Sequence, residues 1–152
     1  MSITSLSGIM KIFGGSQPTP EEQTELANAV MLMTLARATA SDTNIKAIEI
    51  EKVREVLLAH TGQDVPATDV RVAANSKLFE SAPLDKYLAS SAKQMAPADR
   101  MHTAHALAEV INADGRVSDR EIDFFNSVAN SLGLTPAQLM GLSADDPLHQ
   151  PT

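Results

Sequence analysis

The fold is decided by residues 112–121, which read NADGRVSDRE and separate two apolar segments. Gly115 suits a left-handed turn because it has no Cβ atom to clash there. Ser118, with Glu121 three residues later, is the capping-box pattern that opens a helix. Apolar residues recur at helical spacing on both sides, so this stretch is predicted to be the turn between two packed helices.

The two flanking helices differ in how their apolar residues are distributed. The first is predicted to open near Pro97 and is apolar almost all round, which is typical of a helix in the middle of a bundle. The second carries a single apolar stripe, which we expect to be buried: Ile122, Phe125, Val128, Ala129 and Leu132. We expect it to end at Gly133 and a short last helix to begin at Thr135.

The same unit occurs earlier in the chain, displaced by 72 residues. Asp42 then corresponds to Asp114, and Glu49 to Glu121. Core positions correspond as well: Leu35 with Leu107, Ala36 with Ala108, Ile45 with Val117, Ile50 with Ile122, and Val56 with Val128. Neither unit can bury its apolar face alone, so we expect the two helix–turn–helix units to pack as a pseudo-twofold pair.

The remaining segments also read as helices. One is predicted from Pro20 to about residue 40, one after residues 41–44 that ends near Gly62, one after Pro66 and one after Pro83. The sequence therefore predicts an all-α, single-domain helical bundle of six to seven helices, with two pseudo-twofold-related repeats and no β-sheet.

The helical domain is predicted to span residues 18–142, between an N-terminal segment at 1–17 and a C-terminal tail at 143–152. The N-terminal segment has apolar residues at helical spacing: Ile3, Leu6, Ile9, Met10 and Phe13. We interpret it as a short amphipathic helix that docks on the core or on a partner subunit rather than on a membrane.

Composition excludes several classes of protein. A net charge of −7 without a Lys/Arg cluster argues against nucleic-acid binding. No segment has the roughly 20 apolar residues of a membrane span, and no secretory signal pattern is present, so we expect a cytoplasmic protein. The chain has no cysteine, and no catalytic motif is found, so we expect no enzyme activity.

The acidic residues of the two turns are the candidate metal site. Asp42 and Glu49 in the first turn, with Asp114 and Glu121 in the second, would bring up to four carboxylates together if the units face each other. Hard divalent cations such as Ca²⁺ or Mg²⁺ prefer clustered oxygen ligands. The alternative is structural: Glu121 is placed to cap a helix, and Asp114 beside a glycine is an ordinary turn residue.

The helix before the second turn carries a polar stripe formed by His102, His105, Glu109 and Asn112. Histidines one turn apart can hold zinc, whereas a solvated face or hydrogen bonds between helices explain the stripe equally. Glu109 is also equivalent to Arg37 in the repeat, which predicts an ion pair between them. No role is predicted for His60 or His149.

Residues 112–121, followed by SLGL at 131–134, resemble the signature of the TerB-like tellurite-resistance family. The resemblance covers roughly residues 20–142, and the first turn departs from it with Thr43 in place of the glycine and Lys46 in place of the capping serine. It implies a helical fold with two acidic turns and acidic metal-binding surfaces. The implied function is a non-enzymatic module in stress or tellurite resistance. The alternative is a metal-independent protein–protein interaction module, with a protein partner or a second copy docking on its acidic surface.

Overall fold

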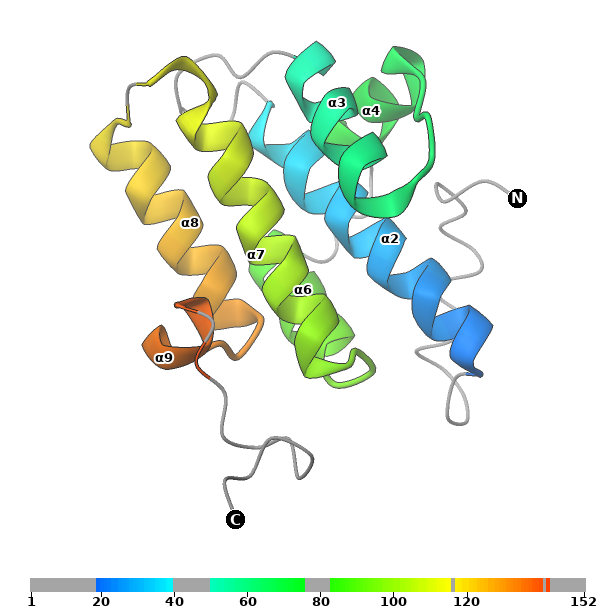
Figure 1. Ribbon diagram of the computed structural model, residues 1–152, viewed down its shortest axis with the longest axis vertical. Coiled ribbons are helices and arrows are strands. Elements are labelled where there is room, and N and C mark those ends of the chain that lie inside the picture. Colours follow the sequence, from blue (N-terminus) through cyan, green and yellow to red (C-terminus); the bar gives the residue numbers. More distant parts are fainter. Residues whose placement is uncertain (1–18, 40–49, 76–82, 116, 141, 143–152) are drawn as a thin grey trace.

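The computed structural model describes residues 19–39, 50–75, 83–115, 117–140 and 142. These residues form seven α-helices, one 3₁₀-helix and no β-strand, which confirms the predicted all-α fold. The helices are α2 (Pro20–Ala38), α3 (Ile50–Thr61), α4 (Ala67–Ala74), α6 (Leu84–Ala92), α7 (Pro97–Ile111), η2 (Asn112–Asp114), α8 (Asp119–Ser131) and α9 (Pro136–Leu139) (Figure 1).

Three of the described helices begin with capping boxes, and the one at Ser118 was predicted from the sequence. Thr19 opens α2, Ser118 opens α8 and Thr135 opens α9. In α2, for example, the Thr19 hydroxyl oxygen accepts the Glu22 N–H at 3.1 Å, and Glu22 Oε1 accepts the Thr19 N–H at 2.8 Å. These bonds satisfy N–H groups that a helix leaves without partners at its first turn.

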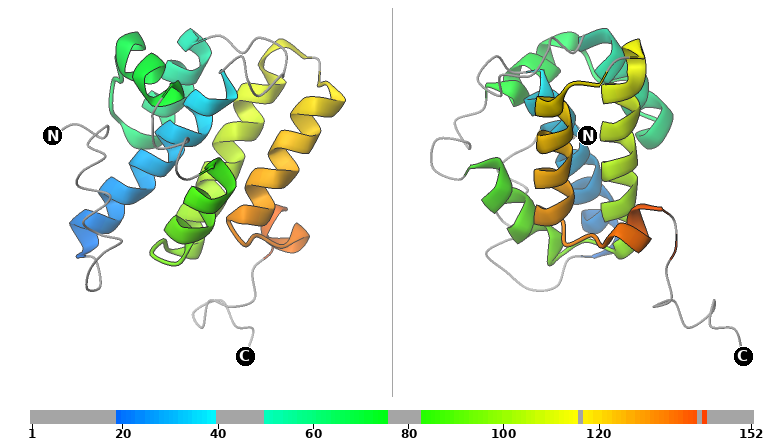
Figure 2. Two further views of the ribbon diagram at one scale, coloured as in Figure 1. Left: turned by 180° about the vertical axis from the view of Figure 1, so that it is seen from behind. Right: turned by 90° about the vertical axis from the view of Figure 1, so that its left-hand side faces the viewer.

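Two helices occupy the centre of the bundle, as their all-round apolar sequences predict. Helix α2 packs against α3, α4, α6 and α7, while α7 packs against α2, α3, α8 and α9. Leu26, Leu32 and Leu35 of α2 and Leu107 of α7 have no exposed surface. Figure 1 shows α2 and α7 running side by side, with α3 and α4 beyond α2 and α8 beyond α7. Helix α6 lies behind α7 in that view and packs against α8 (Figure 2).

The apolar stripe of α8, which was predicted to be buried, is only partly buried. Ile122 was expected in the core, but its side chain is 45 % exposed, and Phe125 is half-buried. The physical reason is the rotation of α8 about its axis. Because α8 packs against both α6 and α7, its buried residues are Glu121, Val128 and Ala129, and Ile122 lies on the edge toward solvent.

The pseudo-twofold repeat is not confirmed. Both helix pairs exist as α2–α3 and α7–α8, but residues 40–49, including the first turn, lie outside the described residues. Helix α3 packs closely on α7, whereas the symmetry-equivalent helices α8 and α2 do not pack to a similar extent among the described residues. The equivalence of the two turns stays a prediction.

None of the described helices combines the length and the apolar character needed to cross a bilayer.

Candidate functional site

The second predicted turn is formed as expected between α7 and α8. After Ile111 the chain tightens into η2, and Gly115 follows with φ of 75°, in the left-handed region. The Gly115 N–H donates to the Asn112 carbonyl oxygen at 3.0 Å and closes the turn. Both devices predicted from the sequence, the left-handed glycine and the Ser118 cap, are therefore confirmed.

Glu121 has a structural role in this turn. Its Oε1 atom accepts the Ser118 N–H at 2.8 Å, and the Ser118 hydroxyl oxygen accepts the Glu121 N–H at 3.1 Å. Only 3 % of Glu121 is exposed. A buried carboxylate is costly unless it is hydrogen-bonded, and here it also lies at the positive end of the α8 dipole. The capping interpretation of Glu121 is thus supported directly.

The four-carboxylate site stays a prediction. The backbone places Asp114 at the end of η2, immediately before Gly115. Asp42 and Glu49 lie outside the described residues, so the structure does not test whether they approach the second turn. Among the residues that are described, no group of three or more Asp, Glu or His side chains is arranged to hold a metal ion.

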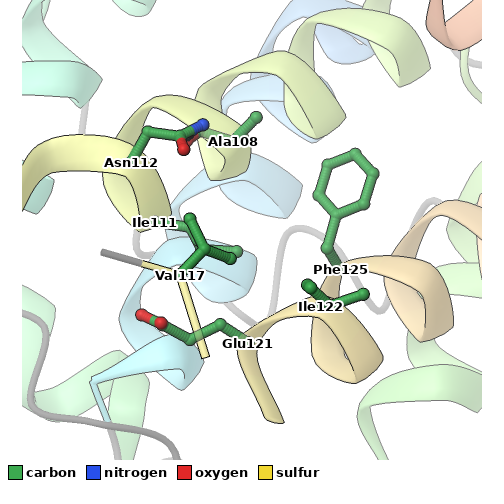
Figure 3. Close-up of a pocket in the computed structure, with 7 residues that line it drawn as sticks. All are labelled: Ala108, Ile111, Asn112, Val117, Glu121, Ile122 and Phe125. Atoms are coloured by element: carbon green, nitrogen blue, oxygen red, sulfur yellow. Dashed lines mark hydrogen bonds between the residues drawn. The ribbon is translucent and has the colours of Figure 1, made fainter. Parts of the chain in front are cut away.

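A pocket of about 230 Å³, the α7–α8 groove, lies beside the second turn (Figure 3). Its lining comes from the last turn of α7, the second turn and the start of α8: Ala108, Ile111, Asn112, Val117, Glu121, Ile122 and Phe125. The lining is mostly apolar, its polar groups are the Asn112 carboxamide and the Glu121 carboxylate, and none of these seven residues is cationic. Val117 and Ile122 are 44 % and 45 % exposed, so the groove is open to solvent.

Hydrogen bonds account for three of the four residues in the predicted polar stripe, and the fourth, His102, is exposed. His105 Nε2 lies 3.1 Å from the Leu139 carbonyl oxygen and joins α7 to α9. Glu109 Oε2 lies 2.5 Å from His60 Nε2 and joins α7 to α3. The Asn112 amide donates back to the Ala108 carbonyl at 2.9 Å. These contacts favour the hydrogen-bonding interpretation of the stripe over zinc binding.

The partner of Glu109 differs from the predicted one. The expected ion pair with Arg37 is replaced by the contact with His60, while Arg37 Nη1 donates to the Ala74 carbonyl at 3.1 Å. Sequence reasoning gave His60 no role, because the two residues are 49 positions apart and no local spacing connects them. It also missed the α7–α8 groove, whose apolar residues read as ordinary core positions.

Comparison with known proteins supports the resemblance seen in the sequence. No curated protein and no solved structure gives a significant match to this chain. The family model described as "Tellurite resistance protein TerB" matches residues 25–144, which spans α2 from its second turn through α9 and includes both predicted acidic turns. This match extends over most of the 152 residues. The chain belongs to the TerB family of tellurite resistance proteins.

Proposed function

We propose that this chain is a non-enzymatic, cytoplasmic module of tellurite or stress resistance that binds a divalent cation, Ca²⁺ or Mg²⁺, at its acidic turns. Family membership supports the connection to tellurite resistance. The candidate ligands are Asp42 and Glu49 in the first turn and Asp114 and Glu121 in the second.

The observation that carries the proposal is the geometry of the second turn. Gly115 in the left-handed conformation and the Ser118 cap fix the backbone that follows Asp114, which is the last residue of η2. The first turn has neither a glycine nor a capping serine at the equivalent positions. Because Glu121 Oε1 serves the cap, we assign the main ligand role of the second turn to Asp114.

Calorimetric titration of the metal-stripped full chain with Ca²⁺ and with Mg²⁺ tests this function. Asp114→Asn and Asp42→Asn are a matched pair, since each removes one charge at an equivalent repeat position. We expect Asp114→Asn to weaken binding at least about tenfold, equivalent to 1.4 kcal/mol, and Asp42→Asn to weaken it less. Equal losses would refute the asymmetry between the turns. A wild-type chain that gives no binding heat with either ion would refute cation binding altogether.

Exposed apolar side chains favour a second candidate, a metal-independent interaction module. Met140, at the end of α9, is 78 % exposed and Leu142 is 63 % exposed, in addition to Val117 and Ile122 at the α7–α8 groove. Apolar surface of this kind marks contact sites for other proteins. This function predicts that Ile122→Asp abolishes tellurite tolerance in a complementation assay while Asp114→Asn preserves it, and cation binding predicts the reverse.

A further inference from the structure

The cap of α8 does not require the charge of Glu121. Glu121 Oε1 accepts the Ser118 N–H at 2.8 Å and completes the capping box. The capping box of α9 works with a neutral side chain, because Gln138 Oε1 accepts the Thr135 N–H at 3.0 Å in the same arrangement. Glu121 is buried, and burying a charged group costs more free energy than burying an amide. The cap therefore accounts for the position of Glu121, whereas its charge is free to serve another partner.

The second carboxylate oxygen of Glu121 is available to a ligand in the α7–α8 groove. Oε2 accepts no hydrogen bond from any described residue, and its surface is not fully covered by the protein. Glu121 is one of the seven residues that line the groove, and none of these is cationic. Buried carboxylates in proteins are paired or hydrogen-bonded, and a cationic donor forms the stronger bond. The groove thus offers a site for a positively charged group.

The rest of the lining fits an aliphatic chain attached to that group. Glu121 and Phe125 are four residues apart on α8, so they lie on one face of the helix, ~6 Å apart along its axis. In Figure 3 the Glu121 carboxylate and the Phe125 ring lie at opposite sides of the lining, and the exposed Val117 and Ile122 form its open edge. The volume of about 230 Å³ is below the ~300–1,000 Å³ of typical small-molecule sites, so the groove suits a single side chain.

We propose that the α7–α8 groove binds an arginine side chain of a partner protein. The guanidinium donates to Glu121 Oε2, and the methylene stem packs on the apolar wall formed by Ile122 and Phe125. Arginine suits a largely apolar site better than lysine because a guanidinium is more weakly hydrated than an ammonium group. The net charge of −7 attracts a cationic partner from a distance. This occupant rests on the interaction module, the second function proposed above, and names the chemistry of its partner.

Chemical-shift titration of the full chain with a blocked arginine tests this occupant. The probe is N-acetyl-L-arginine amide, added to isotope-labelled, metal-stripped chain in the presence of a chelator, so that no divalent ion competes for Glu121. We expect saturable shifts of the Val117 and Ile122 amides, while Leu58 and Val72 on α3 and α4 are references that stay unshifted. N-acetyl-L-citrulline amide has a similar shape without the charge and should bind at least about tenfold more weakly. Absence of saturable shifts, or equal binding of the two probes, would overturn the proposal.

Glu121→Gln separates the charge from the cap. A glutamine keeps an oxygen for the Ser118 N–H, as Gln138 does in α9, so α8 should begin at the same residue. Blocked arginine should bind this variant at least about tenfold more weakly. Asp119→Asn removes the same charge from an exposed site on the opposite side of α8 and should bind within about twofold of the wild type. Equal losses in the two variants would assign binding to the overall charge of the surface and overturn the site.

Two further outcomes separate the arginine occupant from the interaction module on which it rests. If Ile122→Asp abolishes tellurite tolerance while blocked arginine gives no saturable shift, the module stands and the arginine occupant is wrong. If Ile122→Asp leaves tolerance unchanged, the module is refuted, and a partner protein as the source of the arginine is refuted with it. The comparison of blocked arginine with blocked citrulline uses the wild-type chain, so it remains decisive even if Glu121→Gln does not fold.

Discussion

Gly115 is the residue on which the second acidic turn depends. Its φ is 75°, and a Cβ atom added there would meet no other atom within 4 Å. Gly115→Ala therefore measures backbone strain alone, and we expect the free energy of unfolding in urea to fall by about 1 kcal/mol. Gly62→Ala is the matched control, with φ of 74° and equally open space, and should cost the same. A neutral Gly115→Ala variant would mean that the turn does not require the left-handed conformation.

Tyr87 gives the chain a defined sensitivity to alkaline pH. It is 3 % exposed, and burial raises the pKa of its phenol above the ordinary value. The unfolded chain loses this proton near pH 10, while the folded chain keeps it, so the free energy of unfolding decreases as the pH rises above about 10. Compared with Tyr87→Phe, the wild type should lose stability more steeply, by up to about 1.4 kcal/mol per pH unit.

The measurement for Tyr87 is direct because the chain contains one tyrosine and no tryptophan. Tyrosinate absorbance of the native chain should appear only well above the pH at which a urea-unfolded sample ionises. Identical titration curves for the native and unfolded samples would contradict burial of the phenol.

At the scale of helices, the His60–Glu109 contact joins α3 to α7. The side chain of Glu109 is 51 % exposed and that of His60 is 20 % exposed, so solvent screens the interaction. A double-mutant cycle of His60→Gln and Glu109→Gln should give a coupling energy between zero and about 1 kcal/mol, and greater than for a control pair. Glu55, which pairs with Lys52 on α3 at 2.9 Å, provides that control: Glu55→Gln should be additive with His60→Gln. Additivity of His60→Gln with Glu109→Gln as well would show that the contact contributes nothing to stability.

The helices were predictable where their signals are local. A capping box needs two residues three positions apart, so Ser118 with Glu121 marked the start of α8 from the sequence alone, and the helix starts near Pro20 and Thr135 were predicted as well. What depends on packing was not predictable. Whether Ile122 faces the core is decided by the rotation of α8 between α6 and α7, which no spacing within α8 specifies.

In the candidate site, too, the features set by local sequence were predictable and those set by packing between helices were not. The left-handed Gly115 and the cap at Ser118 follow from short-range sequence, and both were predicted. The α7–α8 groove requires the separation and rotation of two helices, and the pairing of His60 with Glu109 requires a third helix to approach α7. A hydrophobic pattern specifies that a helix has an apolar face, but it does not specify which neighbours cover that face.

In the whole molecule, the acidic turn and the groove share one end of α7. The core of α2 and α7 holds that end in place, because the second half of each helix is mostly buried. Cation binding at the turn and protein contact at the groove are therefore separate proposals that concern adjoining surfaces. Removing Asp114 leaves the apolar lining intact, and Ile122→Asp leaves Asp114 in place, so the two experiments report independently.

The internal repeat makes a prediction about the stability of the whole molecule. Leu35 on α2 and Leu107 on α7 are equivalent by the 72-residue displacement, and both have no exposed surface. Truncating a buried leucine removes its transfer free energy and leaves a cavity, so Leu35→Ala and Leu107→Ala should each lower the free energy of unfolding by about 2–5 kcal/mol. Leu58→Ala, at a 49 % exposed position, is the control and should cost no more than about 0.5 kcal/mol.

Combining the two core changes tests how the repeats are arranged. If α2 and α7 face each other across a pseudo-twofold axis through these leucines, the two truncations share one cavity. The double variant should then deviate from additivity by about 0.5 kcal/mol or more. Urea unfolding of the wild type, both single variants and the double variant supplies the cycle. Additive losses would place the two leucines in separate parts of the core, and the repeat would then describe how the sequence is built without describing how its two halves pack.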